Sequence, residues 1–123
     1  MQRLVMLFLN GNGLVKLGND ATLPSVRRLD LSENNLGALK GIGNFPAVFY
    51  VNARKNYLKN TKEIDSMPHL REFIANSNQI ESLGDILHLK KLQLLDFRGN
   101  PLTGIHKDEE KAKYLFAPVR FAV

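Results

Sequence analysis

The sequence contains no cysteine. Disulfide bonds and thiolate metal sites are therefore excluded. An Asn-x-Ser/Thr sequon is also absent, and both absences favour an intracellular protein of the cytoplasm or nucleus. The apolar run at residues 4–9 is too short for the core of a signal peptide and lacks a small-residue cleavage site. We assign this run to the first strand of the fold and expect no contact with a membrane.

The composition is that of one globular domain. Of the 123 residues, 44% are apolar and 24% are charged, which is ordinary for a soluble chain of this length. The net charge of +5 is moderate, and lysines alternate with acidic residues rather than forming a cluster. This charge pattern gives little support for direct binding of nucleic acid.

An eleven-residue pattern recurs five times at intervals of 22 residues. It reads L-x-x-L-x-L-x-x-N-x-L, with other apolar residues accepted at the leucine positions. The five copies begin at Leu4, Val26, Val48, Leu70 and Leu92. Such regularity is the signature of a repeat protein. We therefore divide the chain, as a single domain, into repeats 4–25, 26–47, 48–69, 70–91 and 92–113, with a C-terminal cap at about 106–123.

Alternation within the pattern predicts a short strand in every repeat, with the fourth and sixth positions buried and the third, fifth and seventh exposed. The predicted inward residues are Leu7, Leu9, Leu29, Leu31, Val51, Ala53, Phe73, Ala75, Leu95 and Phe97. An asparagine follows each strand, where the chain turns, and its amide can bond backbone groups of neighbouring turns. We interpret this column as structural; it comprises Asn12, Asn34, Asn56, Asn78 and Asn100.

After the asparagine, apolar residues recur at every third position. In the second repeat they are Leu36, Leu39, Ile42 and Phe45, and in the fourth they are Ile80, Leu83, Ile86 and Leu89. A period of three favours a 3-10 or extended segment over an α-helix.

The repeated pattern resembles that of the leucine-rich repeat family, and the resemblance covers nearly all of the chain. It implies an α/β repeat solenoid, with a curved parallel β-sheet on the concave face and short 3-10 or extended segments on the convex side. The repeat length and short convex segments resemble the intracellular twenty-two-residue subfamily typified by the nuclear regulator of protein phosphatase 1. The same resemblance implies a cap in which a helix at 106–116 leads through Pro118 into a final strand. The usual terminal Leu-Asp is replaced by Ala122-Val123.

The outward positions of the strands form one surface, which we name the concave face. It comprises Met6, Phe8, Asn10, Arg28, Asp30, Ser32, Tyr50, Asn52, Arg54, Glu72, Ile74, Asn76, Leu94, Asp96 and Arg98. Its apolar and aromatic residues are ringed by Arg and Asp, which is typical of a protein-binding surface. Five strands give a sheet about 19 Å wide, enough for one helix of about 10–12 Å diameter. We predict that this face, apart from Asn10, Ser32 and Asn76, binds a helical segment of a protein partner.

Nucleic acid is the competing partner. The basic residues on or beside the concave face are Arg27, Arg28, Arg54, Lys55, Arg71 and Arg98. The acidic residues that interrupt them are Asp30, Glu33, Glu72 and Asp96. A groove that follows phosphates is more uniformly basic. We therefore expect contact with nucleic acid to be at most indirect.

The sequence offers no catalytic constellation. His69, His88 and His106 lie at unrelated repeat positions without a recurring carboxylate nearby, so we predict no catalytic residue, metal site or cofactor. We expect a non-enzymatic interaction module. Two alternatives stay open: a regulatory subunit of an enzyme such as a phosphatase, or a ribonucleoprotein component acting through a protein partner. The second follows from a resemblance of residues 83–85, 99–103 and 118–120 to the spliceosomal A-prime protein, whose concave face holds a helix of an RNA-binding partner.

The first strand lacks a visible cap. Only residues 1–3 precede the first repeat, so nothing in the sequence covers the apolar side chains Leu7 and Leu9 or the free strand edge. We expect either a homodimer through this edge or a longer protein of which this chain is a fragment.

Overall fold

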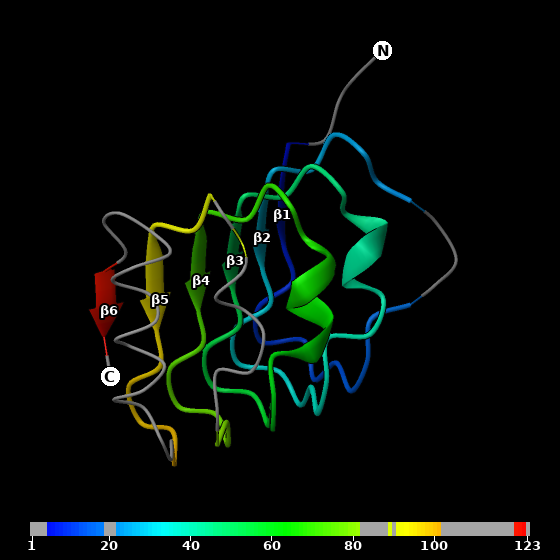
Figure 1. The fold of residues 1–123 in the computed structure, drawn as a ribbon. Helices are drawn as coiled ribbons and strands as arrows, with labels where there is room; N and C mark the ends of the chain where they lie inside the picture. The colour runs from blue at the N-terminus through cyan, green and yellow to red at the C-terminus, as the bar shows by residue number, and fades with distance from the viewer. Residues whose placement is uncertain (1–4, 19–21, 82–88, 90, 102–119, 123) are drawn as a thin grey trace.

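In the computed structural model, the described residues are 5–18, 22–81, 89, 91–101 and 120–122. Six three-residue strands form one parallel sheet in chain order, as Figure 1 shows. The strands are β1 (Met6–Phe8), β2 (Arg28–Asp30), β3 (Tyr50–Asn52), β4 (Glu72–Ile74), β5 (Leu94–Asp96) and β6 (Arg120–Ala122). The parallel β-solenoid and the final strand predicted from the sequence are therefore confirmed.

The strands pair in a constant register. Leu7 pairs with Leu29 and Leu29 pairs with Val51, so the 22-residue interval of the sequence is also the interval between hydrogen-bonded neighbours. This interval holds as far as β5, and only the last pairing, of Leu95 with Phe121, departs from it. Residues at one position of the repeat therefore form straight rows across β1 to β5.

The convex side contains two short 3-10 helices, η1 (Ile42–Asn44) and η2 (Lys62–Ser66). They lie side by side, across the core from the sheet (Figure 1). The expected 3-10 geometry is confirmed here, and Ile42 and Ile64 bring apolar side chains into the core. The described residues contain no α-helix, so the α/β class expected from the resemblance is, over this part of the chain, a β-solenoid with 3-10 turns. The predicted cap helix at 106–116 lies outside the described residues.

The core follows the predicted inward rows. Leu29, Val51, Phe73 and Leu95 are buried at the fourth position, and Leu31, Ala53, Ala75 and Phe97 are buried at the sixth. Leu7 in β1 and Leu9 just after it are partly buried and pack against this cluster.

Large and small residues complement each other in the middle of the solenoid. The small side chains of Ala53 and Ala75 leave room that larger neighbours fill. The rings of Phe73 and Phe97 meet edge to face, with centroids 6.0 Å apart and planes at 75°. This arrangement is favourable for aromatic pairs, and it keeps the core filled where the repeats have the least side-chain volume.

Each strand ends in a turn that needs a left-handed backbone conformation. The residue at the eighth repeat position has a positive φ: 68° at Gly11, 57° at Glu33, 54° at Lys55, 59° at Ser77 and 74° at Gly99. For a residue other than glycine this conformation costs about 1–2 kcal/mol. Three of the five turns carry this cost, so other interactions must stabilise the turn.

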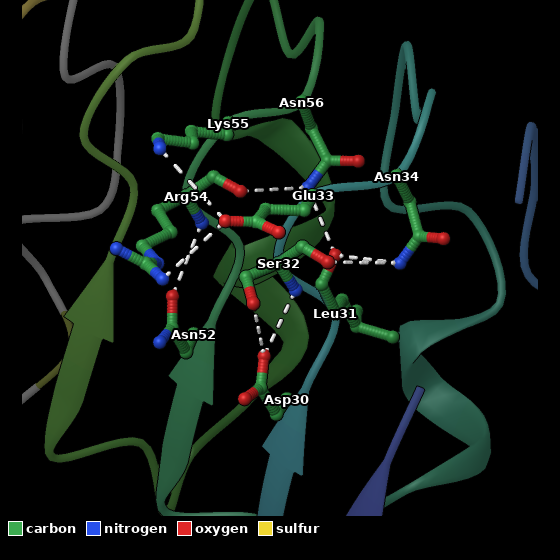
Figure 2. A network of polar contacts seen from close by, with 9 residues as sticks. All are labelled: Asp30, Leu31, Ser32, Glu33, Asn34, Asn52, Arg54, Lys55 and Asn56. Carbon is green, nitrogen blue, oxygen red and sulfur yellow. Dashed lines mark hydrogen bonds and ion pairs between the residues drawn. The ribbon is translucent and has the colours of Figure 1, made fainter. Parts of the chain in front are cut away.

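The asparagine column supplies those interactions. The Nδ2 group of Asn56 donates to the Ala53 carbonyl of its own turn at 3.1 Å. It also donates to the Leu31 carbonyl of the preceding turn at 2.9 Å (Figure 2). Its Oδ1 accepts the backbone N–H of Leu36, again in the preceding turn, at 3.0 Å. Asn34, Asn78 and Asn100 repeat these contacts.

The carbonyls at the sixth position are shared between turns. The Leu31 carbonyl accepts from Asn34 and Asn56, and the Ala75 carbonyl accepts from Asn78 and Asn100. Asn34, Asn56 and Asn78 are buried, so water cannot replace these bonds without opening the turn. The structural role predicted for the column is confirmed.

Replacement of one column residue should destabilise the fold. Asn56→Ala leaves the buried backbone groups of Leu31, Leu36 and Ala53 without this partner, and we expect a loss of about 1–3 kcal/mol in the free energy of unfolding. Asn35→Ala is the matched control, because Asn35 is exposed and its bond to the Leu14 carbonyl comes from its backbone N–H, which alanine keeps. Its effect should stay within about 0.5 kcal/mol of neutral. Urea titration of both variants measures the difference, and equal losses would contradict the assigned role.

Candidate functional site

The concave face consists of three rows of side chains on the side of the sheet opposite the core. The third-position row runs through Met6, Arg28, Tyr50, Glu72 and Leu94, which are successive Cα partners. The fifth-position row is Phe8, Asp30, Asn52, Ile74 and Asp96. The seventh-position row, just beyond the strands, is Asn10, Ser32, Arg54, Asn76 and Arg98. The structure thus brings the predicted site residues onto one surface.

The apolar residues of this face fall into two groups. Met6 and Phe8 on β1 are 45% and 61% exposed. Tyr50, Ile74 and Leu94 lie on β3, β4 and β5 and are half-buried. Tyr50 and Leu94 share the third-position row, and Ile74 lies on the strand between them in the fifth-position row. Ile74 is therefore a diagonal neighbour of both, and because neighbouring strands are about 4.8 Å apart, each side chain can reach the next. We name this set the apolar diagonal.

Three polar residues of the fifth-position row form hydrogen bonds with the turns that follow their strands; they are Asp30, Asn52 and Asp96. The Asp30 carboxylate accepts the backbone N–H and hydroxyl of Ser32 at 2.9 and 2.7 Å, as Figure 2 shows. Asn52 accepts the backbone N–H of Arg54 at 3.2 Å. Such contacts two residues along the chain are Asx turns. An Asp or Asn two residues before Ser or Arg could have predicted these turns. The sequence analysis instead placed these residues on the concave face without a role in the turns.

Ion pairs hold the arginines beyond the strands. Glu33 Oε1 lies 3.5 Å from an Arg54 guanidinium nitrogen and 3.8 Å from Lys55 Nζ (Figure 2). These side chains are close to half exposed, so the pairs contribute little to stability. They do direct the Arg54 side chain along the border of the concave face.

Asp96 differs from its neighbours in burial. It is only 6% exposed, and it accepts the Arg98 backbone N–H at 3.2 Å. The Arg98 guanidinium binds both carboxylate oxygens, at 3.0 and 2.8 Å. Burial acts to raise the pKa of Asp96, but the hydrogen bonds and positive charge of Arg98 outweigh it and lower the pKa below its usual value. Asp96 therefore orients Arg98, which is the member of the pair that faces solvent.

A second cluster lies at the other end of the strands. The residues Arg27, Ala47, Phe49, His69, Arg71 and Lys91 line a pocket of about 240 Å³. The sequence analysis noted the arginines as basic residues beside the concave face, but it did not assign Phe49, His69 and Lys91 to a site. The 22-residue interval could have grouped them, because Phe49 shares the second repeat position with both arginines, and His69 and Lys91 share the last position.

Two absences hold for the described part of the chain. Its His, Asp and Glu residues form no group of three or more that could hold a metal ion. Among the residues that the structure describes, no helix is long and apolar enough to cross a membrane. Of the three histidines considered in the sequence, His69 is exposed, whereas His88 and His106 lie outside the described residues.

The Asp96–Arg98 pair predicts a pH-dependent stability. A carboxyl group whose pKa is lowered on folding stabilises the fold above its unfolded pKa of about 3.9, and this contribution is lost as the pH falls through the folded value. Asp96→Asn should keep the Asx turn, as Asn52 does in the third repeat, but lose this pH dependence. The difference in unfolding free energy between wild type and variant should be constant from pH 7 to about 4 and shrink below that. Urea titrations across this range test it, and a difference independent of pH would contradict the lowered pKa.

Comparison with solved structures identifies the fold. The chain is similar to a leucine-rich repeat protein of Leptospira interrogans, with 28% identity and a TM-score of 0.69 over 82% of this chain and 26% of that chain. It is also similar to internalin C2 of Listeria monocytogenes, with 14% identity and a TM-score of 0.80 over 96% of this chain and 51% of that one. A second Listeria monocytogenes internalin, inlF, matches with 19% identity and a TM-score of 0.65 over 81% of this chain and 29% of its own.

The chain thus spans from about a quarter to about half of the length of these structures. No protein-family model matches the sequence, and neither does any curated protein. The comparisons give no evidence for the intracellular twenty-two-residue subfamily that the sequence resembles. Together with the observed parallel β-solenoid, they show that the chain has the fold of leucine-rich repeat proteins.

Proposed function

We propose that this chain is a non-enzymatic interaction module whose concave face binds a helical segment of a protein partner. The observation that carries the proposal is the apolar diagonal of Tyr50, Ile74 and Leu94, which lies among polar and charged residues of β2 to β5. These side chains are half-buried among their neighbours, so their positions are already restricted before a partner arrives. A surface of fixed apolar anchors loses little conformational entropy on binding, which favours affinity.

The surroundings of the diagonal fit a protein interface. The Arg28 guanidinium stacks on Tyr50 at 5.4 Å from the ring centroid, which fixes the ring beside a positive charge. Arg54 and Arg98 border the opposite end of the strands, and each is held by an acidic residue. Aromatic and arginine side chains are enriched among the residues that dominate binding energy. A partner segment on this face would therefore meet apolar contacts in the middle and charged groups at both borders.

The polar residues of the face have different roles in this proposal. The side-chain oxygens of Asp30, Asn52 and Asp96 accept hydrogen bonds from the turns that follow their strands. In this proposal they shape the surface more than they contact a partner. Glu72 and Arg28 flank Tyr50 in the third-position row and can choose among partners by charge. Met6 and Phe8 add exposed apolar surface on β1, separated from the diagonal by the polar residues of β2.

Other functions have less support. The fold of the structural neighbours favours a protein-interaction module over an enzyme. Neither the structure nor the comparisons support the ribonucleoprotein role or the phosphatase-regulator role. The intracellular location, the homodimer and the at most indirect contact with nucleic acid stay predictions from the sequence.

The proposal is tested on the protein partner recovered by affinity purification with the full chain. Tyr50→Ala and Ile74→Ala should each weaken its binding by more than about 1 kcal/mol while leaving the fold intact, because they remove anchors from the diagonal. Lys59→Ala and Lys62→Ala are the matched controls, since both residues are exposed and lie away from the concave face. Isothermal titration calorimetry gives the affinities, and circular dichroism checks the fold. A greater loss with the lysine variants, together with a steep fall of affinity with salt, would contradict the proposal.

A further inference from the structure

The pocket at the amino-terminal ends of β2, β3 and β4 is built from two rows of side chains that repeat with the turns. The second repeat position supplies Arg27, Phe49 and Arg71, and the last position supplies Ala47, His69 and Lys91. The backbone ladder fixes the first row, because the Phe49 N–H donates to the Arg27 carbonyl and the Arg71 N–H donates to the Phe49 carbonyl. The side chains are therefore stacked one turn apart at the edge of the sheet.

Phe49 holds guanidinium groups in place. The Arg71 guanidinium carbon lies 5.5 Å from the centroid of the Phe49 ring, and that of Arg28 lies 5.6 Å from it. One arginine comes from the turn before Phe49 and the other from the turn after, so the ring contacts guanidinium groups of two different turns. Cation–π contact of this kind restricts flexible arginine side chains while leaving their N–H groups able to bind a ligand.

Lys91 is the third cation that lines the pocket, after Arg27 and Arg71. Its Nζ lies 3.2 Å from Nδ1 of His69. An ammonium group has donors and no acceptor, so His69 accepts through Nδ1 and carries its proton on Nε2. The described residues that line the pocket include no carboxylate, so Arg27, Arg71 and Lys91 gather positive charge around about 240 Å³ of space. An anion placed there would relieve the repulsion among these cations.

We infer that this pocket binds carboxylate side chains of an acidic protein segment. The backbone N–H groups of Phe49, Arg71 and Gln93 already bond within the sheet, so recognition falls to the arginine forks and the lysine. A guanidinium group matches a carboxylate with two parallel hydrogen bonds. The inference rests on the proposed function, since Arg28 contacts both Phe49 of the pocket row and Tyr50 of the concave face. A segment lying on the apolar diagonal can therefore continue with acidic residues into the pocket.

Two observations favour an acidic protein segment over nucleic acid. Two guanidinium groups already contact the ring of Phe49, so a base would compete with them for stacking on this ring. The concave face that continues from the pocket carries Asp30 and Glu72, which would repel a phosphate backbone. The positive charge is local, which suits a short acidic stretch.

The test is an NMR titration of the full chain with capped hexaglutamate, with hexaglutamine and hexauridylate as comparison probes. Hexaglutamate should shift the signals of Phe49, Arg71 and Lys91 saturably, and hexaglutamine should not. The double variant Arg27→Gln, Arg71→Gln should weaken hexaglutamate binding by about five- to tenfold. Lys91→Gln leaves the Phe49 stack in place and should weaken it by about two- to fivefold.

The matched control for the double variant is Lys59→Gln, Lys62→Gln, which removes the same charge from exposed positions outside the pocket. Its effect on hexaglutamate binding should stay below about twofold. An equal loss in both double variants, or shifts scattered over all basic residues, would show general charge attraction and overturn the inference. Tighter binding of hexauridylate at the same signals would assign the pocket to nucleic acid instead. The titration does not involve the partner of the apolar diagonal, so the pocket and the proposed function can fail separately.

Discussion

The hydrogen bonds of the buried asparagine column are the interaction on which the rest of this structure depends. The side chains of Asn34, Asn56, Asn78 and Asn100 each bond two turns at once. Two asparagines share each of the sixth-position carbonyls of Leu9, Leu31, Ala53 and Ala75. The bonds stabilise left-handed turns that glycine occupies at Gly11 and Gly99 but that Glu33, Lys55 and Ser77 occupy at a conformational cost. Because every turn is fixed to the one before it, the 22-residue interval is kept from β1 to β5.

This constant register creates the two surfaces of interest. On the concave face it places Tyr50, Ile74 and Leu94 on neighbouring strands, where they form the apolar diagonal. At the amino-terminal ends of the strands it stacks Phe49 with Arg71, and Arg28 joins the two areas by contacting Phe49 and Tyr50. A solenoid thus converts a sequence period into rows of aligned side chains, and the residues that interrupt a row decide what the surface can bind.

The sequence predicted whatever depends on the period alone. The strands, the buried rows and the asparagine column follow from alternation and a fixed interval. The 3-10 segment at Ile42 follows from the period of three in the second repeat. The sequence could not predict how polar side chains share their hydrogen bonds. Asp96 read as a surface residue, yet it is buried and holds Arg98, because an Asx turn depends on local backbone geometry. The pocket was missed because it forms only where side chains from the second and last repeat positions meet in space.

Native-state amide hydrogen exchange tests the role of the asparagine column most directly. The backbone N–H groups of Leu36, Leu58 and Ile80 donate to Asn56, Asn78 and Asn100 of the following turn. If these side-chain bonds hold the turns together, the three amides should exchange only through global or near-global unfolding, with protection approaching that of the buried β3 and β4 amides. Exchange within about tenfold of the rate in an unstructured chain would show that the column opens locally, and would contradict this account.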